Sequence, residues 1–320
     1  MADEDMPILA EQIRASDANI DVLIYEINEV AGFLDWLAGH DASSVLVWNV
    51  SDGIRGFRGS LIPALARLLG VPYFGNPVPA QALAQDRFKL SAVARDAGVP
   101  VPRCFLARGD QVASSRDTVF EAPRYFVKTN SYGNKVGLGS DAIVATMAGA
   151  LGNAATIQAR FGDDAIVQEY IGGMELRATC LLGPRGMRFS LCHVNFSDPQ
   201  GNALPYYQIT PTGYIGNNFF TPLESTDGFP RDEALRLYAE VGASVRNLTS
   251  ALGLRDYWAM DFRVDEAGHP LLIDLNTGAF PLGDAFDLHA RLEHDLEFPA
   301  ALTRALHLSH AESLRSPAEQ

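Results

Sequence analysis

Three oxygen-bearing side chains in the last quarter of the sequence have the types and spacing of a magnesium site. Asp261 lies in the run YWAMDFRV, and Asp274 and Asn276 lie in the run HPLLIDLNTG, which follows after the turn sequence DEAGH. An antiparallel hairpin of these two runs would bring all three side chains to one end of neighbouring strands, where oxygen ligands suit Mg2+. A magnesium site of this kind usually accompanies ATP. The alternative is a solvated hairpin that carries acidic residues without a metal.

The spacing inside the second run supports the metal interpretation. Asp274 and Asn276 are two residues apart, with Leu275 between them. A strand has a period of two, so both polar side chains point the same way while Leu275 faces the core. The expected ion is Mg2+, with Mn2+ as the second ion that such oxygen ligands accept.

A lysine followed by a glycine-bearing loop is the candidate for phosphate binding. Lys128 lies near the end of the strand-like run YFVKTN, and the loop SYGNKVGLGS that follows contains Ser131, Gly133 and Lys135. Backbone N–H groups of such a loop, together with two ammonium groups, can surround polyphosphate oxygens. The loop does not have the residue order of a Walker A motif, and an ordinary surface turn would explain it about as well.

The end of the strand-like run AIVQEYI and the chain just beyond it are the candidate for adenine and ribose binding. The backbone there could hydrogen-bond an adenine edge, while Glu175, at the start of the next run, could accept from ribose hydroxyls. Glu175 and Arg177 share one face if ELRATC is a strand. The alternative for Glu175 is an exposed acid with an arginine partner across strands. The candidate adenine contacts are Gln168, Glu169, Tyr170 and Ile171.

Composition limits the classes of partner. The net charge of −14 argues against a nucleic-acid partner, because a polyanion would be repelled. No apolar run approaches the roughly 18 residues that span a bilayer, and the acidic N-terminus has no apolar segment of a signal peptide. Cys104, Cys180 and Cys192 lack the paired spacing of a zinc site or a disulfide framework. These features predict a soluble, cytoplasmic protein with no nucleic-acid or membrane partner.

Three regions of the chain supply the elements that must position these residues. Residues 1–84 alternate apolar runs, DVLIYEI, SVLVWNV and VPYFG, with helical patterns, which predicts a short N-terminal parallel α/β domain. Residues 85–170 predict a small central α+β domain, in which QALAQDRFKLSAVARDAG reads as one helix and DAIVATMAGALGNAATIQARFG as another. Residues 171–320 predict a C-terminal α+β domain with a mostly antiparallel sheet and the metal site.

Four runs occur in the order and spacing of the ATP-grasp enzymes. They are ALAQDRFKLSAVARDAGVPVP, FVKTNSYGNKVGLGS, IVQEYIGGMELRATCLLG and YWAMDFRVDEAGHPLLIDLNTG. The chain resembles the ATP-grasp superfamily over roughly residues 45 to 283, and most closely the D-alanine--D-alanine ligase branch. The resemblance implies the ATP-grasp fold, ATP and Mg2+ as cofactors, and a homodimer.

The resemblance also implies a role for each matching residue. Lys128 and the loop from Ser131 to Val136 would contact the ATP phosphates, and Gln168 to Ile171 would contact adenine. Glu175 would bind ribose. The implied magnesium ligands are Asp261, Asp274 and Asn276.

Several positions depart from the pattern of the branch. Arg87 stands where the family has a lysine on ATP, and Asp274 stands where glutamate is usual. Ala259 stands where the ligases carry an arginine that stabilises charge during acyl transfer. Arg177 is the first candidate to replace that arginine, and Lys135 is the second. These changes affect the acceptor side of the site and predict that the substrate is not D-alanine.

The resulting hypothesis is a carboxylate-amine ligase. A small carboxylate would be phosphorylated by ATP, and an amine of an amino acid or short peptide would attack the acyl phosphate, with ADP and phosphate as products. Arg58 could hold a substrate carboxylate, although an exposed charged turn explains its loop equally. His193, in the run CHVNF, is a further candidate for the acceptor pocket.

Two alternatives keep the same fold. The protein could be a kinase that phosphorylates a small molecule without ligation, or a non-catalytic ATP-binding module. A Rossmann-type oxidoreductase is disfavoured, because no G-x-G-x-x-G follows an early strand.

Overall fold

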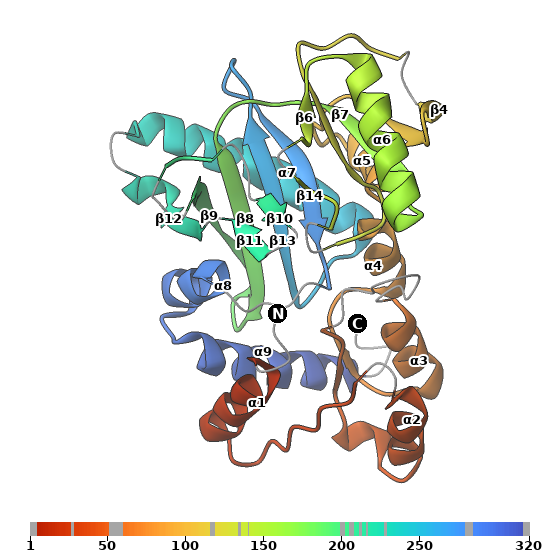
Figure 1. The fold of residues 1–320 in the computed structure, drawn as a ribbon. Coiled ribbons are helices and arrows are strands. Elements are labelled where there is room, and N and C mark those ends of the chain that lie inside the picture. Colours follow the sequence, from red (N-terminus) through yellow and green to blue (C-terminus); the bar gives the residue numbers. More distant parts are fainter. Residues whose placement is uncertain are drawn as a thin grey trace.

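The computed structural model contains two five-stranded sheets with helices packed around them (Figure 1). Every strand pair in both sheets is antiparallel, and the mixture of helices and antiparallel sheets confirms the predicted fold class. The residues that the structure describes are 5–26, 29–50, 60–115, 119–133, 136–139, 141–198, 202–204, 208–210, 213–215, 217–226, 229–278 and 284–315.

The N-terminal region is a small α/β unit with a two-stranded parallel sheet. Strand β1 (Val47–Trp48) pairs with β2 (Tyr73–Phe74) in parallel, as predicted. The helices of this region are α1 (Asp5–Ser16), α2 (Val30–Ala38) and α3 (Leu61–Leu69), with a 3-10 turn at Ala42–Ser44. Helix α1 lies against the C-terminal helix α9 (Phe298–Ser313), and their apolar side chains share one core cluster.

The prediction of a strand in DVLIYEI is wrong for the described residues 21–26, which form no strand. Leu23, Ile24 and Tyr25 are 48%, 45% and 36% exposed, so these apolar side chains are not buried on a sheet. Tyr25 instead packs against Phe33 and Trp36, with ring centroids 5.5 and 6.3 Å away. A short apolar run lacks the neighbouring strand that it needs to form a ladder, and its sequence pattern does not reveal this.

The central sheet has the strand order β4-β3-β7-β5-β6 and is covered by helix α6 (Met147–Phe161) (Figure 1). Two predicted helices differ from the sequence reading. The first is divided into α4 (Val78–Ala84) and α5 (Arg87–Asp96), because the Asp86 side chain caps a new helix by accepting from the Lys89 N–H. Helix α6 begins late because Thr146 is its N-cap. The strands are β3 (Cys104–Arg108), β4 (Gln111–Ser115), β5 (Tyr125–Thr129), β6 (Ile143–Val144) and β7 (Ala165–Glu169).

The C-terminal sheet has the strand order β12-β9-β8-β13-β14. Its strands are β8 (Glu175–Gly183), β9 (Gly186–Ser197), β12 (Asn217–Pro222), β13 (Tyr257–Val264) and β14 (Pro270–Asn276). The long helix α7 (Arg231–Leu252) packs on one face of this sheet through a cluster that includes Leu237, Leu248 and Met260. The remaining elements are β10 (Gln208–Thr210), β11 (Gly213–Ile215), a 3-10 turn at Leu223–Ser225, α8 (Asp284–His289) and a π-helical turn at Ala290–His294.

The division of the chain into residues 1–84, 85–170 and 171–320 stays a prediction. The central sheet uses strands between residues 104 and 169, and the C-terminal sheet uses strands between residues 175 and 276. Among the described helices, none combines the length and apolar character needed to cross a membrane.

A buried polar junction joins the N-terminal region to the start of β13. Asn76 is fully buried, and its Nδ2 donates to the carbonyl oxygens of Tyr257 at 2.6 Å and Thr277 at 3.0 Å. Its Oδ1 accepts from the Arg255 N–H at 3.0 Å. One side chain therefore satisfies three backbone groups on either side of the hairpin that carries the acidic residues.

Replacing Asn76 by alanine should lower the free energy of unfolding by about 3 kcal/mol, because three buried backbone groups lose their partner. Urea unfolding of the purified chain measures this change. Asn19→Ala is the control, since Asn19 is exposed and its side chain bonds only to Asp17 among the described contacts. Equal losses in both variants would contradict the assigned role of Asn76.

Asp256 lies in the same junction and generates a pH-dependent prediction. It is 1% exposed and has a φ of 63°, and its Oδ2 accepts from the Gly75 N–H at 2.8 Å. Burial raises the pKa of its carboxyl from 3.8 to about 6, against the opposing effect of Arg255. The folded state therefore binds the proton of Asp256 more tightly than the unfolded state does. This stabilises the fold in full below pH 3.8, and the contribution is lost as the pH rises through about 6.

The unfolding free energy of the wild type relative to Asp256→Asn should therefore fall by about 2 kcal/mol between pH 4 and pH 7.5. Asparagine is nearly isosteric, tolerates positive φ, and carries no charge to bury. Urea unfolding at both pH values measures the difference, and the exposed Asp110→Asn provides the control. A difference that is independent of pH would show that Asp256 does not titrate in this way.

Candidate functional site

The register of three neighbouring strands gathers the predicted acidic residues on one face of the C-terminal sheet. Arg177 on β8 lies directly opposite Asp261 on β13, and Asp261 lies opposite Asp274 on β14. Asn276 lies opposite Ala259, two residue pairs from Asp261 toward the start of β13. Directly opposed residues share a face, so these side chains form one cluster rather than two surfaces.

Asp261 is buried and is held by an arginine that grips both of its oxygens. The Arg177 Nε donates to Oδ1 at 2.6 Å, and Nη2 donates to Oδ2 at 2.9 Å. The Asn276 Nδ2 is 3.4 Å from the same Oδ2. Burial opposes the charge of Arg177, but the adjacent Asp261 outweighs it, and the pKa of the guanidinium is raised. The pair is a bidentate contact of the strong, charge-assisted kind.

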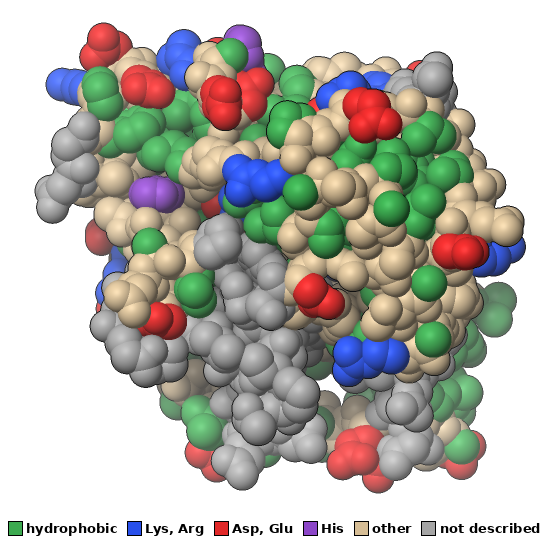
Figure 2. All heavy atoms as spheres, turned by 45° about the horizontal axis from the view of Figure 1, so that its top comes forward, with side chains coloured by type: hydrophobic (Ala, Val, Ile, Leu, Met, Phe, Trp, Pro, Cys, Tyr) green, Lys and Arg blue, Asp and Glu red, His purple; other side chains and the backbone are tan. Residues whose placement is uncertain are grey.

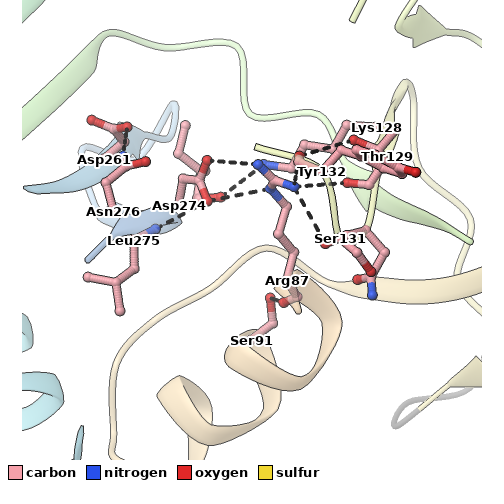
Figure 3. A network of polar contacts seen from close by, with 12 residues as sticks. Arg87, Ser91, Lys128, Thr129, Ser131, Tyr132, Asp261, Asp274, Leu275 and Asn276 are labelled. Atoms are coloured by element: carbon pink, nitrogen blue, oxygen red, sulfur yellow. Dashed lines mark hydrogen bonds and ion pairs between the residues drawn. The ribbon is translucent and has the colours of Figure 1, made fainter. Parts of the chain in front are cut away.

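Asp274 faces two cations that come from the central region (Figure 3). The Arg87 Nε and Nη2 lie 3.5 Å from its Oδ1 and Oδ2, respectively. Burial raises the pKa of Asp274, but the charges of Arg87 and Lys128 outweigh burial and lower it overall. The carboxyl is therefore an anion at neutral pH.

Lys128 bridges the two sheets. It lies on β5 of the central sheet, and its Nζ donates to the Ile273 carbonyl oxygen on β14 at 3.0 Å. Burial lowers the pKa of this lysine to about 8, whereas the neighbouring Asp274 opposes the shift. The lysine before the predicted phosphate loop and the predicted metal ligands thus lie side by side, as Figure 3 shows.

Arg87 fastens the start of α5 to the glycine-bearing loop. Its Nη1 donates to the carbonyl oxygens of Thr129 at 3.1 Å and Tyr132 at 2.7 Å. Asn130 contributes from the same loop, because its Oδ1 accepts from the Phe88 N–H at 2.9 Å. The planar fork of Arg87 therefore connects the loop, helix α5 and Asp274.

The glycine-bearing loop is compact where it is described. The Ser131 N–H donates to the Asp163 carboxylate at 2.8 Å, and the Val136 N–H donates to the Gly133 carbonyl oxygen at 3.2 Å. Gly137 has a φ of 78°, and a Cβ there would lie 3.0 Å from both Phe161 and Thr129. The positive φ and the tight contact with these two side chains both favour glycine at this position.

The predicted adenine segment is partly engaged by the protein itself. Gln168 is buried within β7, and the Glu169 carboxylate binds the exposed Arg103 with an Nε–Oε2 distance of 2.8 Å. The Tyr170 N–H donates to the Arg124 carbonyl oxygen at 3.0 Å. The Ile171 carbonyl oxygen accepts from Arg263 at 3.3 Å.

Arg263 is a site residue that the sequence reasoning missed. Its Nε and Nη2 lie 3.1 and 2.9 Å from the Glu175 Oε2, and both side chains are largely buried. Burial raises the pKa of Glu175, and Arg263 opposes this effect. The alternative predicted for Glu175 therefore holds in part: the cross-strand arginine partner exists and is Arg263, but the acid is largely buried rather than exposed. The signal was available, because Arg263 is two residues beyond Asp261 and shares its strand face.

The structure places His193 away from this cluster. His193 lies opposite Leu176 on β8 and Thr221 on β12, so it shares the face of Leu176, which packs in the core cluster against α7. The suggestion that His193 lines the acceptor pocket is therefore wrong for this sheet. Arg58 and Lys135 lie outside the described residues.

The donor set fits Mg2+ by chemical type. Within the described ranges, no group of three or more His, Cys, Asp and Glu side chains is arranged to hold a metal. The candidate ligands are instead two carboxylates and one amide, all oxygen donors, from facing strands. Both carboxylates already have a cationic partner within the chain, Arg177 for Asp261 and Arg87 for Asp274.

On the face drawn in Figure 2, the described residues form no continuous basic area. In Figure 2 the lysine and arginine side chains of the described residues are separated by acidic and apolar side chains. This distribution agrees with the net charge of −14. A nucleic acid would need clustered positive charge to bind such a surface.

Comparison with known proteins gives several relatives that are named D-alanine--D-alanine ligase. No family model matches the sequence. The D-alanine--D-alanine ligase of Azoarcus sp. (strain BH72) is 31% identical over 228 residues, which are 70% of this chain and 66% of that protein. The chain thus spans slightly less than two thirds of this relative. The D-alanine--D-alanine ligase of Sodalis glossinidius (strain morsitans) is 27% identical over 313 residues, or 96% of this chain and 80% of that protein.

A solved structure has the same fold. The crystal structure of the D-alanine--D-alanine ligase from Bacillus anthracis complexed with ATP superposes with a TM-score of 0.65 at 14% sequence identity. The match covers 98% of this chain and 95% of that one. At this identity the likeness concerns the fold.

Arg87→Lys should loosen the glycine-bearing loop, because an ammonium group cannot donate to several loop carbonyls and to Asp274 at once. Amide hydrogen exchange at residues 129–133 should be about tenfold faster than in the wild type. Mass spectrometry of short peptides resolves this segment. Arg103→Lys, at an exposed ion pair, should leave the same peptides unchanged. Unchanged exchange in Arg87→Lys would remove Arg87 from the anchoring role.

Proposed function

This chain belongs to the D-alanine--D-alanine ligase-like branch of the ATP-grasp superfamily, and from this premise we propose that it is an ATP-dependent ligase joining a small carboxylate to an amine. The observation that carries the proposal is the contact between the two sheets. Lys128 from the central sheet bonds to β14 beside Asp274, so a phosphate-binding cation adjoins two carboxylates.

The nucleotide would lie between the two sheets. Lys128, Arg87 and the loop with Ser131, Gly133 and Lys135 would hold its phosphates. Glu175 would accept from the ribose hydroxyls. The adenine contacts in this proposal are Gln168, Glu169, Tyr170 and Ile171. The ATP complex of the Bacillus anthracis ligase, which shares the fold, supports ATP as the nucleotide.

Lys128 has the electrostatics of a phosphate ligand. Its pKa of about 8 leaves the amine mostly protonated at pH 7, and an approaching phosphate anion would favour the charged form further. Burial of the lysine removes competing water, which strengthens its attraction to an anion.

Asp261, Asp274 and Asn276 would hold Mg2+, or Mn2+ in its place. The ion supplies neutralisation of the phosphate charge during phosphoryl transfer. The chain contributes the positions of the three oxygen donors, which β13 and β14 fix by their register.

The reaction would proceed in two displacements. An oxygen of the substrate carboxylate attacks the γ-phosphorus of ATP, the bond from that phosphorus to the bridging oxygen breaks, and ADP leaves. The amine nitrogen then attacks the acyl carbon, phosphate leaves with the electrons of the C–O bond, and the amine proton passes to solvent. Arg177, with Lys135 as the second candidate, would stabilise the negative charge that develops. Arg58 would hold a substrate carboxylate through two parallel hydrogen bonds.

The acceptor is expected to differ from D-alanine. Ala259 is 4% exposed and lies between Thr179 and Asn276, where the resemblance implies an arginine. A buried methyl group there supplies no charge to a substrate, so acceptor contacts must come from other elements. An amino acid or short peptide remains the proposed substrate class, with a cytoplasmic location and a homodimer as further parts of the proposal.

A coupled assay of ADP release should show turnover only when a carboxylic acid and an amine are both present. A screen over paired amino acids and small acids, with mass spectrometry of the product, would identify the amide. Asp274→Ala should reduce the rate by at least about a hundredfold, because it removes a proposed metal ligand and the carboxylate that faces Arg87 and Lys128. Glu266→Ala, at an exposed position in the same hairpin, is the matched control.

Two results would contradict the ligase proposal. ADP release with acid or another small molecule alone, accompanied by a stable phosphorylated product, would indicate a kinase. Turnover that survives Asp274→Ala would remove that residue from the metal site.

A further inference from the structure

The Arg177 guanidinium occupies both oxygens of the carboxylate that would be a metal ligand. Its Nε–Oδ1 and Nη2–Oδ2 distances to Asp261 are 2.6 and 2.9 Å. The Asp261 side chain is 9% exposed, and that of Arg177 is 27% exposed. The contact is therefore a short, bidentate and nearly desolvated ion pair rather than a loose surface contact.

The other proposed metal carboxylate is held much less tightly. The Arg87 atoms nearest to Asp274 are 3.5 Å from its oxygens, and the same arginine is committed to loop carbonyls at 2.7 and 3.1 Å. Asp274 is therefore available to an additional cation without losing a close partner. At Asp261, in contrast, a metal ion would have to share or displace the contact with Arg177.

We infer that Arg177 and a divalent metal ion compete for Asp261, so that metal binding releases the Arg177 guanidinium to face the substrate anion. This inference rests on the proposed function for the identity of that anion, a carboxylate that becomes an acyl phosphate. It assigns Arg177 two alternating partners instead of one fixed catalytic contact.

Electrostatics sets the two cations in competition at Asp261. The bidentate guanidinium uses one acceptor site on each carboxylate oxygen, and Mg2+ would bind one of the same oxygens at about 2.0 to 2.1 Å. Two cations held against one buried carboxylate also repel each other strongly in a medium of low dielectric constant. Without the metal, in contrast, Arg177 spares the protein a buried and unpaired carboxylate.

The structure offers the released guanidinium a second contact. The Arg177 Cζ lies 5.4 Å from the centre of the Phe220 ring on β12, within the range of a cation–π interaction. Cys192 and Phe220 lie on the same face of the sheet, since Cys192 is opposite Arg177 and Val194 is opposite both Glu175 and Phe220. The arginine can therefore exchange Asp261 for a substrate anion while it keeps its contact with the aromatic ring.

The exchange of Arg177 between Asp261 and a substrate anion depends on the arginine lying at position 177 instead of position 259. Ala259 and Asp261 are two residues apart on β13, and an arginine at 259 would lie opposite Thr179 rather than opposite Asp261. Placed on β8 at 177, the arginine lies directly across from the carboxylate. Because the cation comes from β8 instead of position 259 on β13, Arg177 is directly coupled to Asp261, the proposed metal ligand.

The test measures Mn2+ binding to the protein without nucleotide or substrate, from the signal of free Mn2+ in electron paramagnetic resonance. Arg177→Gln should bind Mn2+ at least about tenfold more tightly than the wild type, because the competing charge is gone. Arg177→Lys, which keeps a charge but loses the bidentate grip, should lie between the two. Arg108→Gln removes a bidentate but exposed pair with Asp164 and should leave the affinity unchanged.

A second measurement uses the wild-type protein and does not depend on the folding of a variant. The arginine Nε–H signal of Arg177 in a 15N NMR spectrum should shift when Mg2+ is added without nucleotide, whereas that of Arg108 should not. Unchanged or weaker Mn2+ binding in Arg177→Gln, or a stationary Arg177 signal at saturating Mg2+, would overturn the inference.

The two hypotheses fail in different ways. Tighter Mn2+ binding in Arg177→Gln together with no amide product under any substrate pair would reject the ligase proposal and keep the competition at Asp261. Amide formation together with unchanged Mn2+ affinity would keep the ligase and reject the competition.

Discussion

The pairing of β8, β13 and β14 is the constraint on which the site depends. It places Arg177, Asp261 and Asp274 in one row across three strands, although 97 residues separate the first from the last in the sequence. A slip of one residue in either pairing would turn one member of this row to the face covered by α7. The apolar side chains of that face, including Leu176 and Met260, therefore fix the positions of the polar ones.

The second constraint is the approach of the central sheet to β14. Lys128 and Arg87 reach Asp274 from different elements, one from β5 and one from the start of α5. Asn130 holds these elements together through its bonds to Phe88 and Asp86. Arg87, which faces the acidic hairpin, is thus held by the same loop that is proposed to bind phosphates. A ligand bound to the loop would therefore change the position of Arg87 relative to the acidic hairpin.

Local pattern made much of this fold predictable, whereas contacts between distant elements were not. The runs that became β5, β7, β8, β13 and β14 follow the strand period closely, and the sites of Lys128, Asp261 and Asp274 followed from it. The sequence does not state which strand pairs with which, so the partnership of Arg177 with Asp261 and of Arg263 with Glu175 was not foreseen. The strand predicted for DVLIYEI did not form for the same reason, because an apolar run becomes a strand only where a neighbouring strand can pair with it.

Charge balance connects these observations. The chain carries a net charge of −14, yet Glu175, Asp261 and Asp274 each have an arginine partner. Desolvating three carboxylates within one face of a sheet costs several kcal/mol for each one that is left unpaired, so a metal-free fold requires internal cations. Under the competition inferred here, a metal ion at Asp261 would have to bind more strongly than Arg177, which it would replace. The affinity of the proposed metal site would then depend on this arginine as well as on the oxygen donors.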